Sequence, residues 1–286
     1  MKAHVSRSPA FEQALGASRE RAVLVPGAYD ALSAKLIEEA GFPLIYVGSF
    51  AVAASAHGLP DVGVITLDDM TEAVRAIRSS VDLPVLADAE GGFLGPANIW
   101  RTVRQFETAG AAAIHIEDHA GDKHTNLPQY LVPLDLMLGR LRAAQDARTS
   151  DDFAIIARTD AIWATGDLQE AARRVEAFAS IGIRHFFPTA ATPSDLAFLR
   201  ERIDGTYVTI DLPKVMDRSE WDGAADLVID YDFSLRATAK ALKHALNEFA
   251  VQREAAPLRA LLETAEEFEA RFGYNAYVER ATTYTR

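Results

Sequence analysis

The chain of 286 residues contains no cysteine. This absence excludes disulfide bonds, zinc or iron–sulfur sites with cysteine ligands, and every mechanism that uses a catalytic thiol. Basic residues are also few, 29 against 41 acidic ones, which gives a formal net charge of −12. Nucleic acids and anionic membrane surfaces bind clusters of lysine and arginine, so this charge argues against both kinds of partner.

Long apolar runs are absent as well. No run approaches the roughly 20 residues that a membrane-spanning helix requires, and residues 1–10 lack the apolar segment of a secretory signal. We therefore expect a cytoplasmic protein. The composition, with 49% hydrophobic and 24% charged residues, is typical of a globular chain that buries a sizeable core.

Eight short apolar segments alternate with stretches that have helical spacing. The segments are too apolar for strands that face water on one side, so they predict a parallel sheet covered on both faces. At this length the pattern favours α/β architecture of the TIM type, a closed (β/α)8 barrel, and no Gly-x-Gly-x-x-Gly follows the first strand to support a dinucleotide-binding sheet. The predicted strands cover residues 22–25, 44–47, 84–87, 112–116, 153–157, 185–187, 206–210 and 227–229. The predicted helices cover residues 29–40, 67–80, 96–109, 134–147, 168–181, 193–202 and 233–254, and residues 211–223 fit neither pattern.

The chain continues beyond the eighth repeat. Residues 255–272 carry apolar side chains at helical spacing, and we predict one further helix there. Its apolar stripe needs a surface outside the barrel, which a second copy of the chain can supply. We therefore divide the chain into a barrel domain, residues 1–254, and a C-terminal helical extension for oligomerisation, residues 255–286.

One apolar segment ends in two carboxylates. Residues 85–93 read VLADAEGGF, so Asp88 and Glu90 stand one residue apart at the end of a predicted strand. Side chains at i and i+2 of a strand point the same way, and two like charges side by side favour a hard divalent cation between them. A strand followed by a polar turn is the alternative interpretation, because Asp, Glu and Gly are common in turns.

Polar residues recur at the ends of other predicted strands, where barrels of this type carry their reactive groups. This clustering predicts a site for a metal-bound carboxylate substrate. Asp88, with Glu90 or Glu117, would hold the metal, and a metal that bridges a 2-oxo group and its carboxylate stabilises an enolate. Arg158 would bind the substrate carboxylate in bidentate fashion, although it could instead pair with a neighbouring acid such as Asp160. The other candidates are Tyr46, Gly48 and Ser49 at the end of the second strand, Asp61 in the loop that follows it, and His119, Lys123, His124, Thr125 and Asn126 after the fourth strand.

Several of these stretches resemble the isocitrate lyase/phosphoenolpyruvate mutase superfamily, over residues 25–236. The resemblance implies a (β/α)8 barrel whose extra C-terminal helix is exchanged between paired subunits, often in a dimer of dimers, that is, a homotetramer. It also implies Mg²⁺ as the metal, with Mn²⁺ as an alternative, and cleavage of a C–C or P–C bond beside a pyruvate-like enolate. The stretches that carry it are residues 26–30, 58–61, 66–69, 88–93, 113–118 and 157–160.

The resemblance also implies roles for single residues. Asp88 matches the principal metal ligand, and Glu90 and Glu117 match acidic positions around the metal and its waters. Asp61 matches an acid near the metal, and Arg158 matches the substrate-binding arginine. Tyr46, Gly48 and Ser49 match the turn that binds the oxoacid, and Lys123 to Asn126 fall in the mobile loop over the site.

Four departures separate the chain from the superfamily pattern. Glu90 replaces an aspartate and is one methylene longer, and Gly48-Ser49 replaces Ser-Gly. The lyases' loop motif Lys-Lys/Arg-Cys-Gly-His is replaced by residues 123–126, KHTN. Near the sixth strand, where lyases carry Glu and mutases His, the chain has Thr189 after a proline.

The missing cysteine argues against isocitrate and methylisocitrate lyase activity by the route that uses it. We predict a Mg²⁺-dependent lyase or decarboxylase that cleaves a C–C bond of a small 2-oxo or 2-hydroxy carboxylate. Arg158, Lys123, Asn126 and Glu117 are the predicted catalytic residues, and His119 is the next candidate for proton donor. A phosphonopyruvate-type mutase or hydrolase, and a non-catalytic carboxylate-binding relative, are the alternatives.

Overall fold

The computed structural model describes residues 11–16, 21–120, 123–210 and 217–285. Contacts between residues divide the chain into two compact units, Met1–Leu235 and Arg236–Arg286. In the described part of the chain, every strand belongs to the first unit. No helix in these residues is long and apolar enough to cross a membrane.

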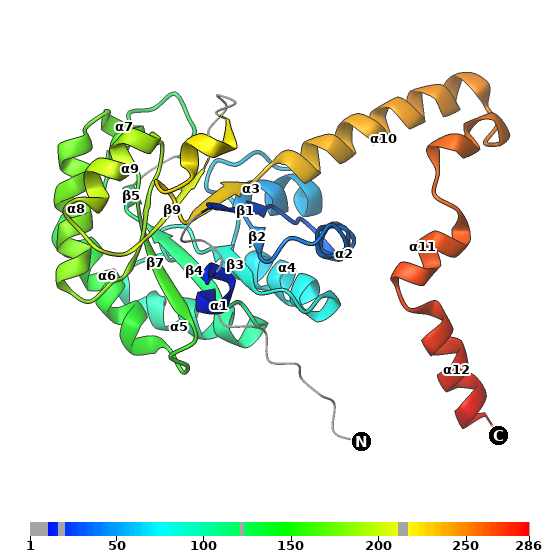
Figure 1. Cartoon of the computed structure of the whole chain (residues 1–286), viewed down its shortest axis with the longest axis horizontal. Coiled ribbons are helices and arrows are strands. Elements are labelled where there is room, and N and C mark those ends of the chain that lie inside the picture. The colour runs from blue at the N-terminus through cyan, green and yellow to red at the C-terminus, as the bar shows by residue number, and fades with distance from the viewer. Residues whose placement is uncertain (1–10, 17–20, 121–122, 211–216, 286) are drawn as a thin grey trace. The chain divides into compact units, whose positions relative to one another are not determined.

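Eight short parallel strands form the centre of the first unit (Figure 1). They are β1 (Val23–Pro26), β2 (Ile45–Val47), β3 (Val85–Asp88), β4 (Ala113–Glu117), β7 (Ala154–Thr159), β8 (His185–Pro188), β9 (Thr206–Ile210) and β10 (Leu227–Asp230). Their order is β1-β10-β9-β8-β7-β4-β3-β2. A bridge between Gly27 and Tyr46 joins the two outer members, and the Ala28 amide donates a hydrogen bond of 2.8 Å to the Tyr46 carbonyl. The predicted strands and the TIM-type barrel are therefore confirmed.

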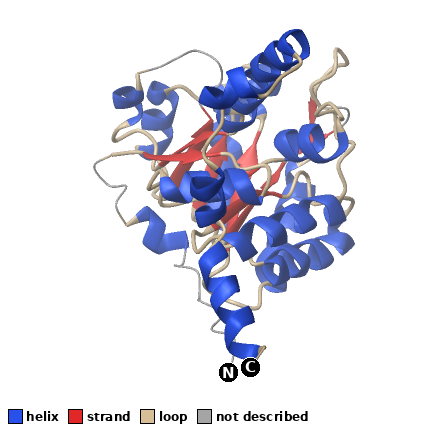
Figure 2. Cartoon of the chain, turned by 90° about the vertical axis from the view of Figure 1, so that its right-hand side faces the viewer, coloured by secondary structure: helices blue, strands red, loops and turns tan. Residues whose placement is uncertain are grey.

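Helices cover the outside of this barrel, as Figure 2 shows. They are α2 (Ala31–Glu39), α4 (Leu67–Ser80), α5 (Pro96–Ala109), α6 (Leu134–Ala147), α8 (Leu168–Ser180) and α9 (Pro193–Arg200). Helix α4 shows why they form: Thr66 and Asp69 make a capping box at its start, and Met70, Val74 and Ile77 bury one face. All six agree with the sequence predictions.

The starts of the strands are closed by a helix that the sequence did not predict, α1 (Phe11–Leu15). Phe11 is fully buried in one apolar cluster with Val23 and Leu227, the first residues of β1 and β10. Its ring meets that of His185, the first residue of β8, edge to face at 5.4 Å. A helix of five residues is too short to show a hydrophobic period, so the pattern did not indicate it.

The ends of the strands carry short extra elements, which the sequence also did not indicate. After β2 come α3 (Ser49–Val52) and a π-helical turn, η1 (Ala53–His57). After β4 a hairpin forms from β5 (His119–Ala120) and β6 (Tyr130–Leu131), and after β7 comes α7 (Ala161–Thr165). These elements surround the mouth of the barrel, where the sequence predicted the site.

The segment that the sequence left unassigned follows β9. Residues 211–216 of it lie outside the described part of the chain. The next residues form a 3-10 helix, η2 (Arg218–Trp221), in which Trp221 is buried against the core.

The C-terminal part of the chain is helical. Helix α10 (Phe233–Gln252) agrees with the prediction and runs from the first unit into the second. It is followed by a 3-10 helix, η3 (Ala256–Leu261), and by α11 (Ala265–Arg271) and α12 (Tyr274–Tyr284). The proposed boundary after residue 254 stays a prediction.

The single helix predicted over residues 255–272 is wrong. The backbone is extended at Leu262, and a new helix begins after Thr264. There the Thr264 hydroxyl accepts from the Glu267 amide, and the Glu267 carboxylate accepts from the Thr264 amide at 3.1 Å. This capping box competes with helix continuation, and the spacing of apolar residues did not reveal it.

Candidate active site

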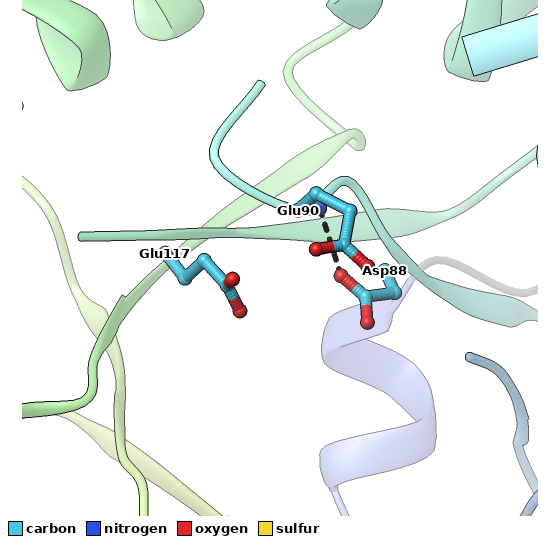
Figure 3. A group of neighbouring side chains, drawn as sticks. All are labelled: Asp88, Glu90 and Glu117. Atoms are coloured by element: carbon cyan, nitrogen blue, oxygen red, sulfur yellow. Dashed lines mark hydrogen bonds between the residues drawn. The ribbon is translucent and has the colours of Figure 1, made fainter. Parts of the chain in front are cut away.

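Three carboxylates meet where β3 and β4 end (Figure 3). One oxygen from each of Asp88, Glu90 and Glu117 lies within 4.8 Å of the other two, and we call these residues the three-carboxylate cluster. The strands are neighbours, so their last residues come together. Glu90 has a φ of 48°, and this left-handed turn lets its amide donate to Asp88 Oδ1 at 2.8 Å.

The three-carboxylate cluster fits a hard divalent cation. All of its donors are oxygens, the ligands that Mg²⁺ and Mn²⁺ favour. Glu90 Oε1 is buried without a hydrogen-bond partner in the described residues. When all of its acids are ionised, the cluster together with Asp160 carries four negative charges, against two positive charges on Lys123 and Arg158. A divalent cation would balance this difference.

Lys123 enters the cluster from the loop after β5. Its Nζ lies 2.9 Å from Glu117 Oε2 and 3.2 Å from Glu90 Oε2, and its side chain is 4% exposed. Burial alone would lower the pKa of Lys123, but the attraction of Glu117 and the other acids raises it above its ordinary value. The ammonium group is therefore retained at neutral pH.

Arg158, at the end of β7, pairs with an acid as the alternative interpretation anticipated. Its Nε and Nη2 donate to the two oxygens of Asp160 at 2.9 and 3.3 Å, and Nε also donates to Thr189 Oγ1 at 3.0 Å. Nη1 lies 3.1 Å from Glu117 Oε2. A guanidinium has five N–H groups, so one on Nη1 and one on Nη2 remain for a substrate carboxylate.

The carboxylate of Asp88 is held by several neighbours. Ser49 donates to Oδ2 at 3.1 Å, and Tyr46 Oη lies 3.5 Å from the same atom. His115, which the sequence analysis missed, lies 3.1 Å from Tyr46 Oη through Nε2 and 3.7 Å from Asp88 Oδ1 through Nδ1. These contacts fix the orientation of the proposed principal metal ligand.

The carboxyl groups of the cluster differ in acidity. Burial raises the pKa of Glu117 to about 8, against the opposing attraction of Arg158 and Lys123. Burial also opposes ionisation of Asp88, but His115, when it is protonated at low pH, and the cations Lys123 and Arg158 lower the pKa of Asp88 below its ordinary value. For His115 itself burial dominates and lowers the pKa to about 4, so that ring is neutral near pH 7.

A cavity of about 310 Å³ opens beside the cluster, at the mouth of the barrel. Its lining is polar near Asp88 and Arg158 and apolar near Phe50 and Trp163. Lys123 lines this cavity and also a second one of about 530 Å³ on the side of Glu90 and Glu117. The first cavity is lined by Tyr46, Gly48, Ser49, Phe50, Pro60, Asp61, Val62, Asp88, Lys123, His124, Arg158, Trp163, Thr189, Ile210 and Tyr231.

The structure thus brings together most of the residues that the sequence singled out. Asn126 is exposed and lines neither cavity, so its catalytic role stays a prediction. His119 is buried, with Nδ1 at 3.6 Å from Asp160 Oδ2, and its ring packs on Trp163. His115 was missed although it precedes Glu117 by two residues, and the strand period of two would have placed both inside the barrel.

Comparison with known proteins shows a family match and relatives that are named as lyases. The phosphoenolpyruvate phosphomutase family matches residues 12–250. The chain is 40% identical to 2-methylisocitrate lyase of Escherichia coli K12 over 208 residues, which are 72% of this chain and 69% of that protein. It is 39% identical to 2,3-dimethylmalate lyase of Eubacterium barkeri over 167 residues, 58% of this chain and 57% of the relative.

Solved structures show the same fold. Phosphoenolpyruvate phosphomutase from Streptomyces platensis subsp. rosaceus has a TM-score of 0.88 at 27% identity, covering 96% of this chain and 98% of that one. Phosphonopyruvate hydrolase, solved in complex with oxalate and Mg²⁺, has a TM-score of 0.84 at 27% identity, covering 96% and 99%.

Proposed function

The chain belongs to the phosphoenolpyruvate phosphomutase family, and from this premise we propose that it is a metal-dependent lyase or decarboxylase. It would cleave a C–C bond of a small 2-oxo or 2-hydroxy carboxylate. The observation that carries the proposal is the three-carboxylate cluster in contact with Lys123 and Arg158, beside a cavity of about 310 Å³. Relatives with 34% to 40% identity are named as lyases or as an oxaloacetate decarboxylase.

Each part of the site has a task in this reaction. Asp88, Glu90 and Glu117 would hold the cation, for which we propose Mg²⁺ with Mn²⁺ as a substitute. When bound, such a cation supplies Lewis-acid stabilisation of the enolate. Arg158 would hold the substrate carboxylate through its remaining Nη1 and Nη2 protons, and the turn at Ser49 would hold a second anionic end.

Cleavage or transfer at a P–C bond is the second candidate. The phosphonate-processing enzymes named among the solved structures cover nearly the whole chain. Lys123 lies where it could neutralise charge on a substrate in the cavity. Thr189 stands where mutases of the superfamily carry His, and this departure makes the P–C reaction the second choice rather than the first.

A panel of small acids with Mg²⁺ tests the proposal. Oxaloacetate, alkyl-substituted malates, methylisocitrate and phosphonopyruvate would each be followed by NMR for release of a 2-oxo acid, bicarbonate or phosphate. We expect turnover of a C–C substrate that stops when the metal is chelated. Release of phosphate or phosphoenolpyruvate from phosphonopyruvate would favour the second candidate. Binding of acids without any turnover would favour a non-catalytic carboxylate-binding protein.

We also propose that the C-terminal extension joins subunits. No residue of α10, α11 or α12 is buried, and apolar side chains such as Leu262, Phe268 and Phe272 are 61%, 44% and 40% exposed. Exposed apolar groups of this kind favour association. We expect a dimer, or a dimer of dimers, in which these helices are exchanged between subunits. Light scattering that gives a monomer would contradict this assembly.

A further inference from the structure

The proposed reaction needs a proton donor that the sequence does not supply in the usual form. Breaking a C–C bond leaves an electron pair on carbon, and that carbon must take up a proton before the product leaves. The chain has no cysteine to provide it. Among the described residues that line the first cavity, His124 alone carries an imidazole ring.

The ring of His124 is held by two neighbours. Its Nε2 lies 3.4 Å from Asp61 Oδ2, and its plane meets that of Trp163 edge to face with 5.2 Å between ring centroids. Both neighbours line the same cavity as Asp88 and the substrate-binding candidate Arg158. A carboxylate on one ring nitrogen orients the imidazole and leaves the other nitrogen, Nδ1, for the substrate.

The backbone supports this placement. His124 has a φ of 58°, in the left-handed region that side chains other than glycine rarely adopt. Such a conformation persists only where the surroundings hold it, and it is common at active sites. Here Lys123, the preceding residue, is fixed by Glu117 at 2.9 Å, and Asp61 fixes the ring itself.

Other groups of the described site are less suited to donate this proton. His119 is buried beside Asp160 and lines the second cavity, not the first. His115 is fully buried beneath Tyr46. Lys123 donates hydrogen bonds to the carboxylates of Glu90 and Glu117, and these negative charges stabilise its ammonium form, so it gives up its proton less readily.

The charges around His124 allow its ring to change protonation. Burial lowers its pKa, and Lys123 and Arg158 lower it further, whereas Asp61 and Asp160 raise it. The ring of His119 also packs on Trp163, and a proton on either histidine disfavours a proton on the other. A substrate carboxylate in the cavity adds negative charge, so substrate binding favours the protonated ring.

We propose that His124, oriented by Asp61, is the catalytic acid that protonates the carbon released by bond cleavage. The role rests on the proposed function, because it presupposes an enolate-type product in the first cavity. His124 lies in a loop from which the sequence analysis predicted only Lys123 and Asn126 as catalytic residues.

The proton balance is simple. In a 2-hydroxy acid, the hydroxyl gives its proton to water, the carbonyl forms, and the C–C electron pair stays on the neighbouring carbon. His124 gives its Nδ1 proton to that carbon, and the proton held by water restores the ring. In a 2-oxo acid that loses CO₂, the electron pair enters the enolate, the ring protonates the enolate carbon, and a proton from solvent restores the ring.

Hydrogen exchange of pyruvate tests this role without the unknown substrate. In the reverse sense, neutral His124 would remove a methyl proton from bound pyruvate and return deuterium from D₂O. NMR of the methyl signal with Mg²⁺ should show exchange by the unaltered protein. His124→Gln should lower the exchange rate by about 100-fold, while oxalate affinity measured by calorimetry stays unchanged. Leu127→Ala, in the same loop but 57% exposed and outside both cavities, should exchange as the unaltered protein does.

The pH dependence separates a proton-transfer role from a structural one. Exchange should rise with pH through the pKa of His124, because the neutral ring removes the proton, and this rise should vanish in His124→Gln. Exchange by His124→Gln equal to that of the unaltered protein would overturn the proposal and leave the proposed function intact. Loss of oxalate affinity together with exchange would assign the ring a structural role. An unaltered protein that binds oxalate with Mg²⁺ but exchanges no pyruvate would overturn the role of His124 toward a pyruvate enolate, whereas turnover in the panel of acids would still support the proposed function.

Discussion

The two ends of the barrel are built from different kinds of residue. At the starts of the strands, Phe11 lies fully buried with Val23, Leu44 and Leu227 in one apolar cluster. At the ends of the strands the interior is filled by acids and bases, most of them as deeply buried. Among these are Asp88, Glu117, Lys123, Arg158 and Asp160.

We infer from this difference that the apolar end stabilises the fold and that the charged end carries the chemistry. Burying an apolar ring stabilises the fold, whereas burying a charge costs free energy unless it is paired. Even paired, a buried ion pair often contributes no more than apolar residues of the same volume. A barrel that keeps so many charges at one end therefore keeps them for function, as barrels of this type do at their C-terminal ends.

Asp88→Asn should have the largest effect at the charged end. The change keeps the shape but removes the charge that a metal would need at the proposed principal ligand, whose orientation is fixed by Ser49 and the Glu90 amide. We expect Mg²⁺ and Mn²⁺ affinity to fall by more than about 100-fold, the upper range for loss of an outer-shell partner. Calorimetry measures this. Asp146→Asn, on the exposed face of α6, is the matched control, and equal affinities in the two variants would remove Asp88 from the site.

Arg158→Lys should have a somewhat smaller effect. Lysine cannot reproduce the paired contacts to Asp160 and Glu117 and still present two N–H groups to a substrate. Disrupting a buried charge pair costs about 3 kcal/mol. We therefore expect kcat/KM to fall roughly 100-fold, with KM raised and kcat lowered. Arg142→Lys, on the exposed face of α6, is the control. Unchanged kinetics would show that Arg158 pairs only with Asp160 and Glu117 and does not bind the substrate.

Phe11→Ala tests the apolar end. Removing a fully buried ring should lower the free energy of unfolding by about 3 kcal/mol, measured by chemical denaturation. The Mg²⁺ affinity of the folded protein should stay the same, because the three-carboxylate cluster lies at the other end of the strands. A weaker affinity in this variant would mean that the two ends are coupled and that the division drawn above is wrong.

The smallest effect concerns pH. Burial raises the pKa of Glu117 to about 8, so below that pH the group is protonated and a bound cation must displace a proton. Mg²⁺ affinity should therefore rise with pH, by up to about tenfold per unit for one displaced proton, and level off above the pKa. Calorimetry in buffers of different ionisation enthalpy would count the protons. An affinity that does not change below the pKa would contradict this account.

Sequence patterns predicted the barrel well because each strand is a short apolar run and each helix has its own period. The same patterns failed where local hydrogen bonding decides the structure. The capping box of Thr264 divides one apolar stripe between η3 and α11, and spacing alone cannot show such a break.

The site was predictable to the extent that its residues stand at strand ends. Asp88, Glu117 and Arg158 are such residues, and the structure brings them together. The contacts of His124 and Trp163 could not be predicted, because they arise between separate loops whose conformations depend on tertiary packing. The pairing of Arg158 with Asp160 was foreseen only as an alternative to substrate binding, and the geometry now allows both.

Binding of oxalate with and without Mg²⁺ tests the central claim most directly. Oxalate resembles the planar enolate of pyruvate, and phosphonopyruvate hydrolase has been solved with oxalate and Mg²⁺. If the charged end of the barrel binds a metal ion that stabilises an enolate, calorimetry should show tight oxalate binding only when Mg²⁺ is present. The substitution Asp88→Asn should then abolish oxalate binding. Equally tight binding after the metal is chelated, or in Asp88→Asn, would contradict the claim.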